Sequence, residues 1–320
     1  HPVAHSFPTR RSSDLLVVGW DVGLVARPTR AELVLSFVGA NVWLLLPLLS
    51  WGAVHRRWLR RGRDPEARPI SPQYEPPDGM GPAEAGTIID HHPHVHDLTA
   101  TIVDLAVRGW LRIEEVEPDG ILSRILSRPD YAFVRLDDPA GDKLRTYEAR
   151  TLAALFGALD VPGGRVTTDD LENEFYRDIP GIRDAIFDGL VSKGLYVERP
   201  DKVRGRWAVG GVLLSVFAGF TLIALHLPLG TGPVTAGVAG FGLGIPLLIY
   251  AWWMPARTRE GARATEHVRG LEEFLSRVEQ DRFRRMITTP EQFEALLPYA
   301  MALEVDVKWA AAFDDLFTEP

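Results

Sequence analysis

Three helix-length stretches of this chain contain no Asp, Glu, Lys or Arg, and soluble helices seldom continue that far without a charge. The first covers residues 33–54, and a helix of about 20 residues crosses the ~30 Å core of a bilayer. The block 207–256 is long enough for two helices and is divided by a Pro- and Gly-rich turn at 227–233. We predict one span at 32–54 and a helical hairpin with spans at 207–226 and 234–255. A buried helix pair in a soluble core is the alternative.

Basic clusters flank these stretches and predict their orientation. The side chains are Arg56, Arg57, Arg60, Arg61 and Arg63 after the first span, and Lys202, Arg204, Arg206, Arg257, Arg259 and Arg263 around the hairpin. Because positively charged flanks stay on the cytoplasmic side, residues 55–206 and the tail 257–320 are predicted to be cytoplasmic, in the cytoplasmic (inner) membrane of a bacterium. The first cluster sets the topology, and the same charges are available to anionic lipid headgroups.

The N-terminal residues are not expected to belong to the fold. The segment HSFPTRRSSDL at 5–15 resembles an in-frame translation of a sequencing adapter, so we treat residues 1–15 as an artefact. Residues 16–31 are then the stub of an extracytoplasmic region, and residues 55–80 form a basic and Pro-rich linker. The authentic N-terminus, with any signal peptide, is expected to lie outside this sequence.

Residues 81–200 are predicted to form an α+β domain. Helices at 82–90 and 98–108, a left-handed Gly109 and alternating strands at 110–115 and 131–136 follow the order of a winged helix. Helices at 146–159, 167–176 and 180–193, then Gly194 and a strand at 195–198, repeat that order. We therefore predict a mainly α membrane protein with a tandem winged-helix-like domain. Amphipathic helices of the tail 257–320 are expected to pack on it.

Charge and composition restrict the function of this domain. Residues 75–199 hold 24 acidic and 13 basic side chains, a balance of −11 within a chain of net charge −8. An acidic domain is a poor match for nucleic acid, which demands clustered Lys and Arg. The chain has no cysteine, which excludes disulfides and thiolate chemistry. No nucleophile elbow, phosphate-binding loop, zincin or kinase motif occurs, so neither an enzymatic activity nor a cofactor is predicted.

Four closely spaced histidines are the one candidate metal site. They are His91, His92, His94 and His96, flanked by Asp90 and Asp97. Imidazole and carboxylate groups at this spacing suit zinc or nickel. The alternative, which we prefer, is a solvated turn between two helices, because Pro93 interrupts helical spacing and no distant ligand set is evident.

Small residues recur every four positions in both helices of the predicted hairpin. They are Gly211, Ser215 and Gly219 in one helix and Ala236, Gly240 and Gly244 in the other. Such faces allow two helices to approach closely, within the hairpin as we prefer or between two copies in a homodimer. The spans carry no carboxylate, Lys or Arg, which argues against an ion or proton pathway.

Three motifs, in order, resemble a bacterial family of predicted membrane proteins, domain of unknown function 2207. They are YEPPDGMGPAEAG at 74–86, TATIVDLAVRGWLRIE at 99–114 and LLPYAMAL at 296–303. The resemblance covers about residues 34–316 and implies a preceding extracytoplasmic β-rich domain with a signal peptide. It implies no activity. The sequence departs from the family pattern at DHHPHVH, residues 90–96, where relatives tend to carry charged residues.

Together these features predict a multi-pass membrane protein that docks a protein partner on its cytoplasmic domain, as a scaffold or signal relay. The alternative is a membrane-tethered winged-helix transcription regulator, disfavoured because the predicted recognition helix offers only Arg108 as a cation. A third hypothesis is a hydrolase or metalloenzyme whose chemistry resides in the missing outer domain.

Overall fold

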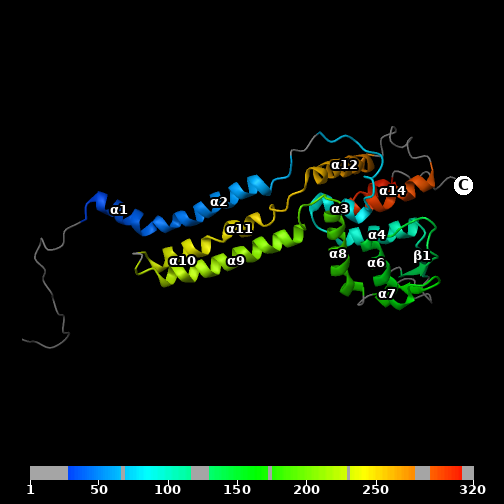
Figure 1. Ribbon diagram of the computed structural model, residues 1–320, viewed down its shortest axis with the longest axis horizontal. Coiled ribbons are helices and arrows are strands. Elements are labelled where there is room, and N and C mark those ends of the chain that lie inside the picture. The colour runs from blue at the N-terminus through cyan, green and yellow to red at the C-terminus, as the bar shows by residue number, and fades with distance from the viewer. Residues whose placement is uncertain are drawn as a thin grey trace, which may run out of the picture.

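The computed structural model describes residues 28–65, 69–116, 130–171, 175–228, 231–277 and 289–311. Within these ranges the chain is mainly helical, as predicted, and contains one three-stranded sheet. Figure 1 shows long helices side by side at one end of the molecule and a domain of shorter helices around the sheet at the other. We call this second part the globular domain; it comprises α3 to α8, the sheet, α12, α14 and α15.

The described residues contain three helical segments long and apolar enough to cross a membrane, in agreement with the sequence. The first joins α1 (Arg30–Asn41), the 3-10 turn η1 (Val42–Leu44) and α2 (Leu45–Arg61). The second is α9 (Pro200–Ala224), and the third joins α10 (Pro233–Gly242) to α11 (Ile245–Tyr250). Their apolar side chains face outward, with Leu35 70 % and Phe217 73 % exposed. Burial in lipid rather than in protein explains such a surface.

Two helices continue past the predicted span ends, because a charge marks the limit of lipid rather than the limit of a helix. The helix α2 continues through the arginines to Arg61, seven positions beyond the predicted span and into the predicted linker. The helix α9 begins at Pro200, where proline is suited to the first turn, well before the predicted start at 207. The third segment ends at Tyr250, earlier than the predicted 255.

The α10–α11 segment packs between α9 and α2 (Figure 1). The helix is interrupted at Leu243 and Gly244, between α10 and α11. Pro246 follows directly, and its missing N–H and bulky ring favour a break in a helix. The carbonyl of Leu243 accepts a hydrogen bond from Ser50 Oγ at 2.7 Å. The break therefore supplies a polar contact that links the first segment to the third.

The sheet of the globular domain crosses the predicted boundary between the two winged-helix-like units. Strands β1 (Leu111–Val116), β2 (Asp130–Arg135) and β3 (Arg165–Thr167) pair antiparallel in that order. The strand β3 comes from the part of the sequence assigned to the second winged-helix-like unit, yet it pairs with β2 of the first. One sheet thus spans both predicted units, because the open edge of β2 takes β3 as its hydrogen-bonding partner.

The strand predicted at 195–198 is wrong: within it only Tyr196 forms an isolated bridge, to Arg257. Gly194 adopts φ 71° at the end of α8 (Phe175–Ser192), and the Leu195 amide returns to the Leu190 carbonyl at 3.0 Å. That backbone therefore terminates a helix instead of extending a strand.

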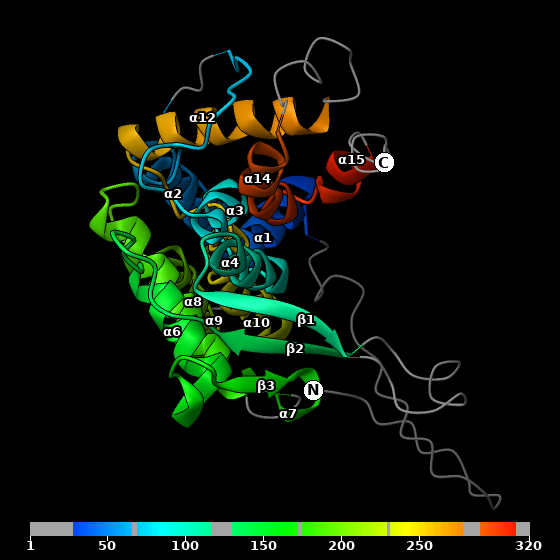
Figure 2. The same cartoon turned by 90° about the vertical axis from the view of Figure 1, so that its right-hand side faces the viewer.

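The remaining helices and the second 3-10 turn complete the globular domain. They are α3 (Pro82–Asp90), α4 (Val95–Val107), α6 (Thr146–Phe156), the 3-10 turn η2 (Gly157–Leu159), α7 (Thr168–Leu171), α12 (Arg259–Ser276), α14 (Pro290–Ala302) and α15 (Asp306–Ala311). Tail residues such as Leu271 and Trp309 share one buried cluster with Ile88 and Leu98. Figure 2 shows α12 and α14 on one side of α3 and α4 and the sheet on the other. The tail therefore packs on the preceding domain and completes its core.

Candidate functional site

The apolar helices meet the globular domain at a junction formed where α2 ends, α9 begins and α11 leads into α12. The basic clusters found in the sequence converge here. Arg57, Arg61 and Arg206 line one cavity, and Arg204 and Arg257 contact the end of α3 nearby. Asp64 and Arg257, which are 193 positions apart in the sequence, are in contact at this junction. The junction therefore forms only when the chain adopts its tertiary structure.

Arg257 is the most buried cation of the junction, at 9 % exposure. Its backbone N–H donates to Asp64 Oδ1 at 2.7 Å, and its guanidinium contacts the other oxygen of the same carboxylate. The guanidinium also donates from Nε to the Ile88 carbonyl at 3.0 Å and from Nη2 to the Ile89 carbonyl at 2.9 Å. The last carbonyls of a helix lack partners within it and attract cations. Arg257 thereby ties the chain after α2 to the C-terminus of α3.

Arg204, on α9, reaches the same helix end from another side. Its Nη1 donates to the carbonyl of His91 at 3.2 Å, and its guanidinium lies 4.7 Å from the centroid of the Trp252 ring. The backbone of His91 is left-handed at φ 64° and ends α3, so the last carbonyls of that helix have no partners within it. Two arginines attached to different apolar helices therefore satisfy the carbonyls of residues 88–91.

One of the four histidines, His91, turns away from the other three, whose rings stay in contact. The His91 ring points inward, with Nδ1 2.8 Å from Tyr196 Oη, and burial lowers the pKa of His91 to about 4. His94 pairs with Asp90 at 2.7 Å, and the rings of His92 and His96 lie against the ring of His94. Within the described ranges, no three His, Asp or Glu side chains come together as a set of metal ligands. We do not propose a metal site.

Asp97 is a buried acid beside this turn, at 0 % exposure. Its Oδ2 accepts a hydrogen bond from the His94 backbone N–H at 2.7 Å, while Oδ1 accepts none from the described residues. Burial raises the pKa of Asp97 to about 8, with smaller contributions from the nearby acids Asp90 and Glu304. One backbone hydrogen bond stabilises the carboxylate less than the loss of hydration destabilises it.

A second buried polar cluster fixes α3, α4, α6 and α8 to one another. It contains the buried acids Glu84, Asp104 and Glu148, the partly exposed acid Asp142, and the bases Arg108, Arg145 and Lys193. Arg108 contacts Asp104 at 2.9 Å and Glu148 at 3.0 Å. Because every charge in the cluster has an opposite partner, the cluster is suited to a structural role.

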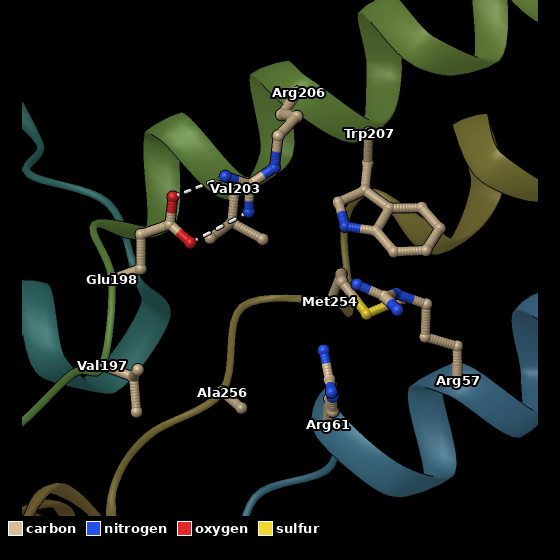
Figure 3. Close-up of a pocket in the computed structure, with 9 residues that line it drawn as sticks. All are labelled: Arg57, Arg61, Val197, Glu198, Val203, Arg206, Trp207, Met254 and Ala256. Atoms are coloured by element: carbon tan, nitrogen blue, oxygen red, sulfur yellow. Dashed lines mark hydrogen bonds and ion pairs between the residues drawn. The ribbon is translucent and has the colours of Figure 1, made fainter.

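The cavity at the junction lies where headgroups would meet the helices and has a volume of about 500 Å³. Figure 3 shows Arg57 and Arg61 on α2 directed toward Arg206, Trp207 and Met254 across it. All five arginines of the first cluster are exposed, but Arg56, Arg60 and Arg63 do not line the cavity. The structure therefore separates a cluster that is uniform in sequence into two groups.

The six small residues singled out in the sequence lie where α9 packs on α10 and α11. Ser215 Oγ donates to the Phe241 carbonyl at 2.9 Å, and Ala236 is buried. A Cβ on Gly240 would stand 2.5 Å from the Ala218 carbonyl oxygen and 2.6 Å from Gly219 Cα, and one on Gly211 would stand 2.9 Å from the Leu248 side chain. These small residues therefore allow α9 to pack closely on α10 and α11 within one chain.

Gly240→Ala is therefore expected to lower the free energy of unfolding by about 1–3 kcal/mol, because backbone atoms cannot move aside as side chains can. Gly52→Ala is the matched control, since a Cβ at Gly52 meets nothing within 4 Å. Denaturant titration of both variants in detergent measures the difference. Equal stabilities would show that the contact between α9 and α10 does not depend on glycine.

The family profile described as predicted membrane protein (DUF2207), C-terminal domain, matches residues 70–313. The chain belongs to the DUF2207 family. The match begins after α2 and includes α9 to α11, so the DUF2207 domain contains two of the three apolar segments between its globular parts. It also contains Arg204 and Arg257, whereas Arg57, Arg61 and Asp64 precede it. Searches of curated proteins and of solved structures gave no match.

Proposed function

We propose that this DUF2207 protein is a multi-pass protein of the bacterial cytoplasmic membrane that relays conformational changes between its spans and a protein partner docked on a cytoplasmic globular domain. The observation that carries the proposal is the polar junction, where Arg204 and Arg257 connect α9 and the α11–α12 segment to one end of α3. A domain that served only as a passive anchor would not need its helix ends held by buried cations.

The continuity of α9 supports the relay. This helix starts among residues of the globular domain, where Val203 is buried, and continues without interruption to Ala224. A helix of 25 residues is about 37 Å long and stiff, so movement of its membrane part is transmitted to the domain. Helix α9 and the α10–α11 segment would form the helical hairpin, with the basic clusters on the cytoplasmic side.

The acidic globular domain supports protein docking rather than DNA binding. We propose that α3, α4 and the β1–β2 hairpin form a winged-helix-like unit, which β3 extends. Arg108, the cation of the predicted recognition helix, is 21 % exposed and is engaged by Asp104, Glu148 and Asp142. It is therefore not free to hold phosphates. No observation favours the transcription regulator, and the docking scaffold remains the proposal.

Site-specific photocrosslinking in cells tests whether a protein partner docks on the globular domain. A photoreactive residue at the exposed Val161 of the full chain is expected to capture one defined protein, confirmed by saturable binding of the purified pair. The same residue placed at Leu213, on the exposed face of α9, is the control and should capture lipid only. Identical capture from the domain and from α9 would contradict docking on the domain.

A further inference from the structure

The cavity at the junction carries an uncompensated positive charge. Of its three guanidinium groups, that of Arg206 is held by Glu198 through two hydrogen bonds of 2.7 and 2.9 Å. Arg57 and Arg61 have no carboxylate within ion-pair distance among the described residues. They stand one helical turn apart and enter the cavity from the same face of α2 (Figure 3). Two free guanidinium groups on one rigid helix are suited to two oxygens of one phosphate.

The other walls of the cavity are apolar and aromatic. Val203, Trp207 and Met254 line it, and the Arg57 guanidinium lies 5.6 Å from the Trp207 ring centroid. Stacking on the ring restrains the guanidinium, so less entropy is lost when it binds an anion. A volume of about 500 Å³ accommodates a phosphate with a glycerol-sized substituent.

Aromatic side chains place this cavity at the depth of lipid headgroups. Trp58 Nε1 donates to the Trp253 carbonyl at 3.1 Å, and the Tyr250 ring packs on those of Trp51 and Trp253. Tryptophan and tyrosine concentrate where a helix leaves the hydrocarbon core. A ligand in the cavity would therefore have its phosphate at the arginines and its apolar part toward the lipid-facing helices.

We propose that this cavity is a specific site for a phosphate ester, held by Arg57 and Arg61 and packed against Trp207. The ester can come from the headgroup of an anionic phospholipid or from a soluble phosphate ester. A zwitterionic headgroup fits poorly, because its ammonium group would stand beside guanidinium groups of the same sign. The proposal goes beyond the relay function and does not depend on it.

Native mass spectrometry of the full chain in a neutral detergent tests the site, with phosphatidylglycerol and phosphatidylcholine of the same acyl chains as probes. We expect one phosphatidylglycerol to bind more tightly than phosphatidylcholine. Arg57→Ala/Arg61→Ala is expected to weaken that binding at least about tenfold, since two charge-assisted hydrogen-bonding groups are lost. Arg56→Ala/Arg60→Ala removes the same charge from the same helix outside the cavity and is expected to change it less than about twofold.

Soluble glycerol phosphate distinguishes the two sources. Its binding to the wild-type chain but not to Arg57→Ala/Arg61→Ala, together with no preference for phosphatidylglycerol, would assign the site to a soluble ester. Equal losses in the two double variants, or equal binding of both lipids with no glycerol phosphate bound, would overturn the proposal in favour of general surface charge. Arg57→Lys/Arg61→Lys keeps the charge but removes the planar set of N–H donors of the guanidinium group, so intermediate affinity is expected. This variant also controls for misfolding of the alanine variant.

Discussion

Replacing Arg257 by alanine is expected to lower the free energy of unfolding by about 2–5 kcal/mol, since each buried polar group left without its partner costs about 1–3 kcal/mol. The truncation leaves the carbonyls of Ile88 and Ile89 and the carboxylate of Asp64 without their donor. The helix carbonyls cannot regain water at this buried site, whereas the Asp64 carboxylate is 35 % exposed and is partly hydrated. Denaturant titration in detergent, followed by the fluorescence of the nine tryptophans, measures the loss.

Arg259→Ala is the matched control, because Arg259 belongs to the same basic flank but is exposed. Its effect is expected to stay within about 0.5 kcal/mol. Arg257→Lys keeps the charge but not the fork that serves three acceptors, so an intermediate loss is expected. If Arg257→Ala and Arg259→Ala were equally stable, the junction would contribute nothing to the fold.

The same substitution tests the relay. The chain has no cysteine, so labels attached at Leu48→Cys in α2 and Val161→Cys in the globular domain report one distance without background labelling. Electron spin resonance should give a narrow distance distribution for the wild-type background and a broad one for Arg257→Ala. A distribution that stays narrow would mean that other contacts couple the helices to the domain, which would contradict the role proposed for Arg257.

Asp97→Asn is expected to stabilise the protein, and increasingly so as the pH rises. The folded carboxyl has a pKa of about 8, above the ordinary value of 3.8, so the folded state retains a proton that the unfolded state releases. The wild-type protein therefore loses stability by roughly 1.4 kcal/mol per pH unit between those two values. Asparagine keeps the acceptor for the His94 N–H without the ionisation, and its advantage reaches the order of 5 kcal/mol above pH 8.

Measurements at pH 7, 8 and 9 isolate this effect. Below pH 6.5 the buried His91, with its pKa lowered to about 4, adds a loss of stability on the acid side. Asp170→Asn is the control, because hydrogen bonds from the Thr167 backbone N–H and hydroxyl lower the pKa of this exposed carboxyl. No gain is expected there. An Asp97→Asn advantage that did not change with pH would show that Asp97 is ionised in the folded protein.

The sequence predicted those features of the structure that depend on residues close together in the chain. Charge-free runs predicted the three apolar segments, and the family motifs predicted membership in DUF2207. Gly109 and Gly194 end helices with φ 82° and 71°, as their positions after apolar periodic segments indicated. Each of these depends on residues within a few positions of one another.

The sequence did not predict which distant segments pair with one another or which of their side chains become buried. Nothing local distinguishes Arg57 and Arg61 from Arg56 and Arg60, and only the placement of α9 beside α2 makes two of them line a cavity. The acid at Asp64, directly after the basic run, was a signal that could have pointed to an internal ion pair with a distant cation. The three-residue strand β3 is too short to show alternation.

The sequence by itself therefore determined where this protein prefers lipid to water, which family it belongs to and where α3, α4 and α8 end, because hydropathy and capping act over short spans of chain. Tertiary structure alone decided which arginines cap α3, which ones line the cavity, and that Asp97 loses its water. Those outcomes depend on solvent exclusion and on the meeting of groups far apart in the chain, and no single segment of sequence encodes either.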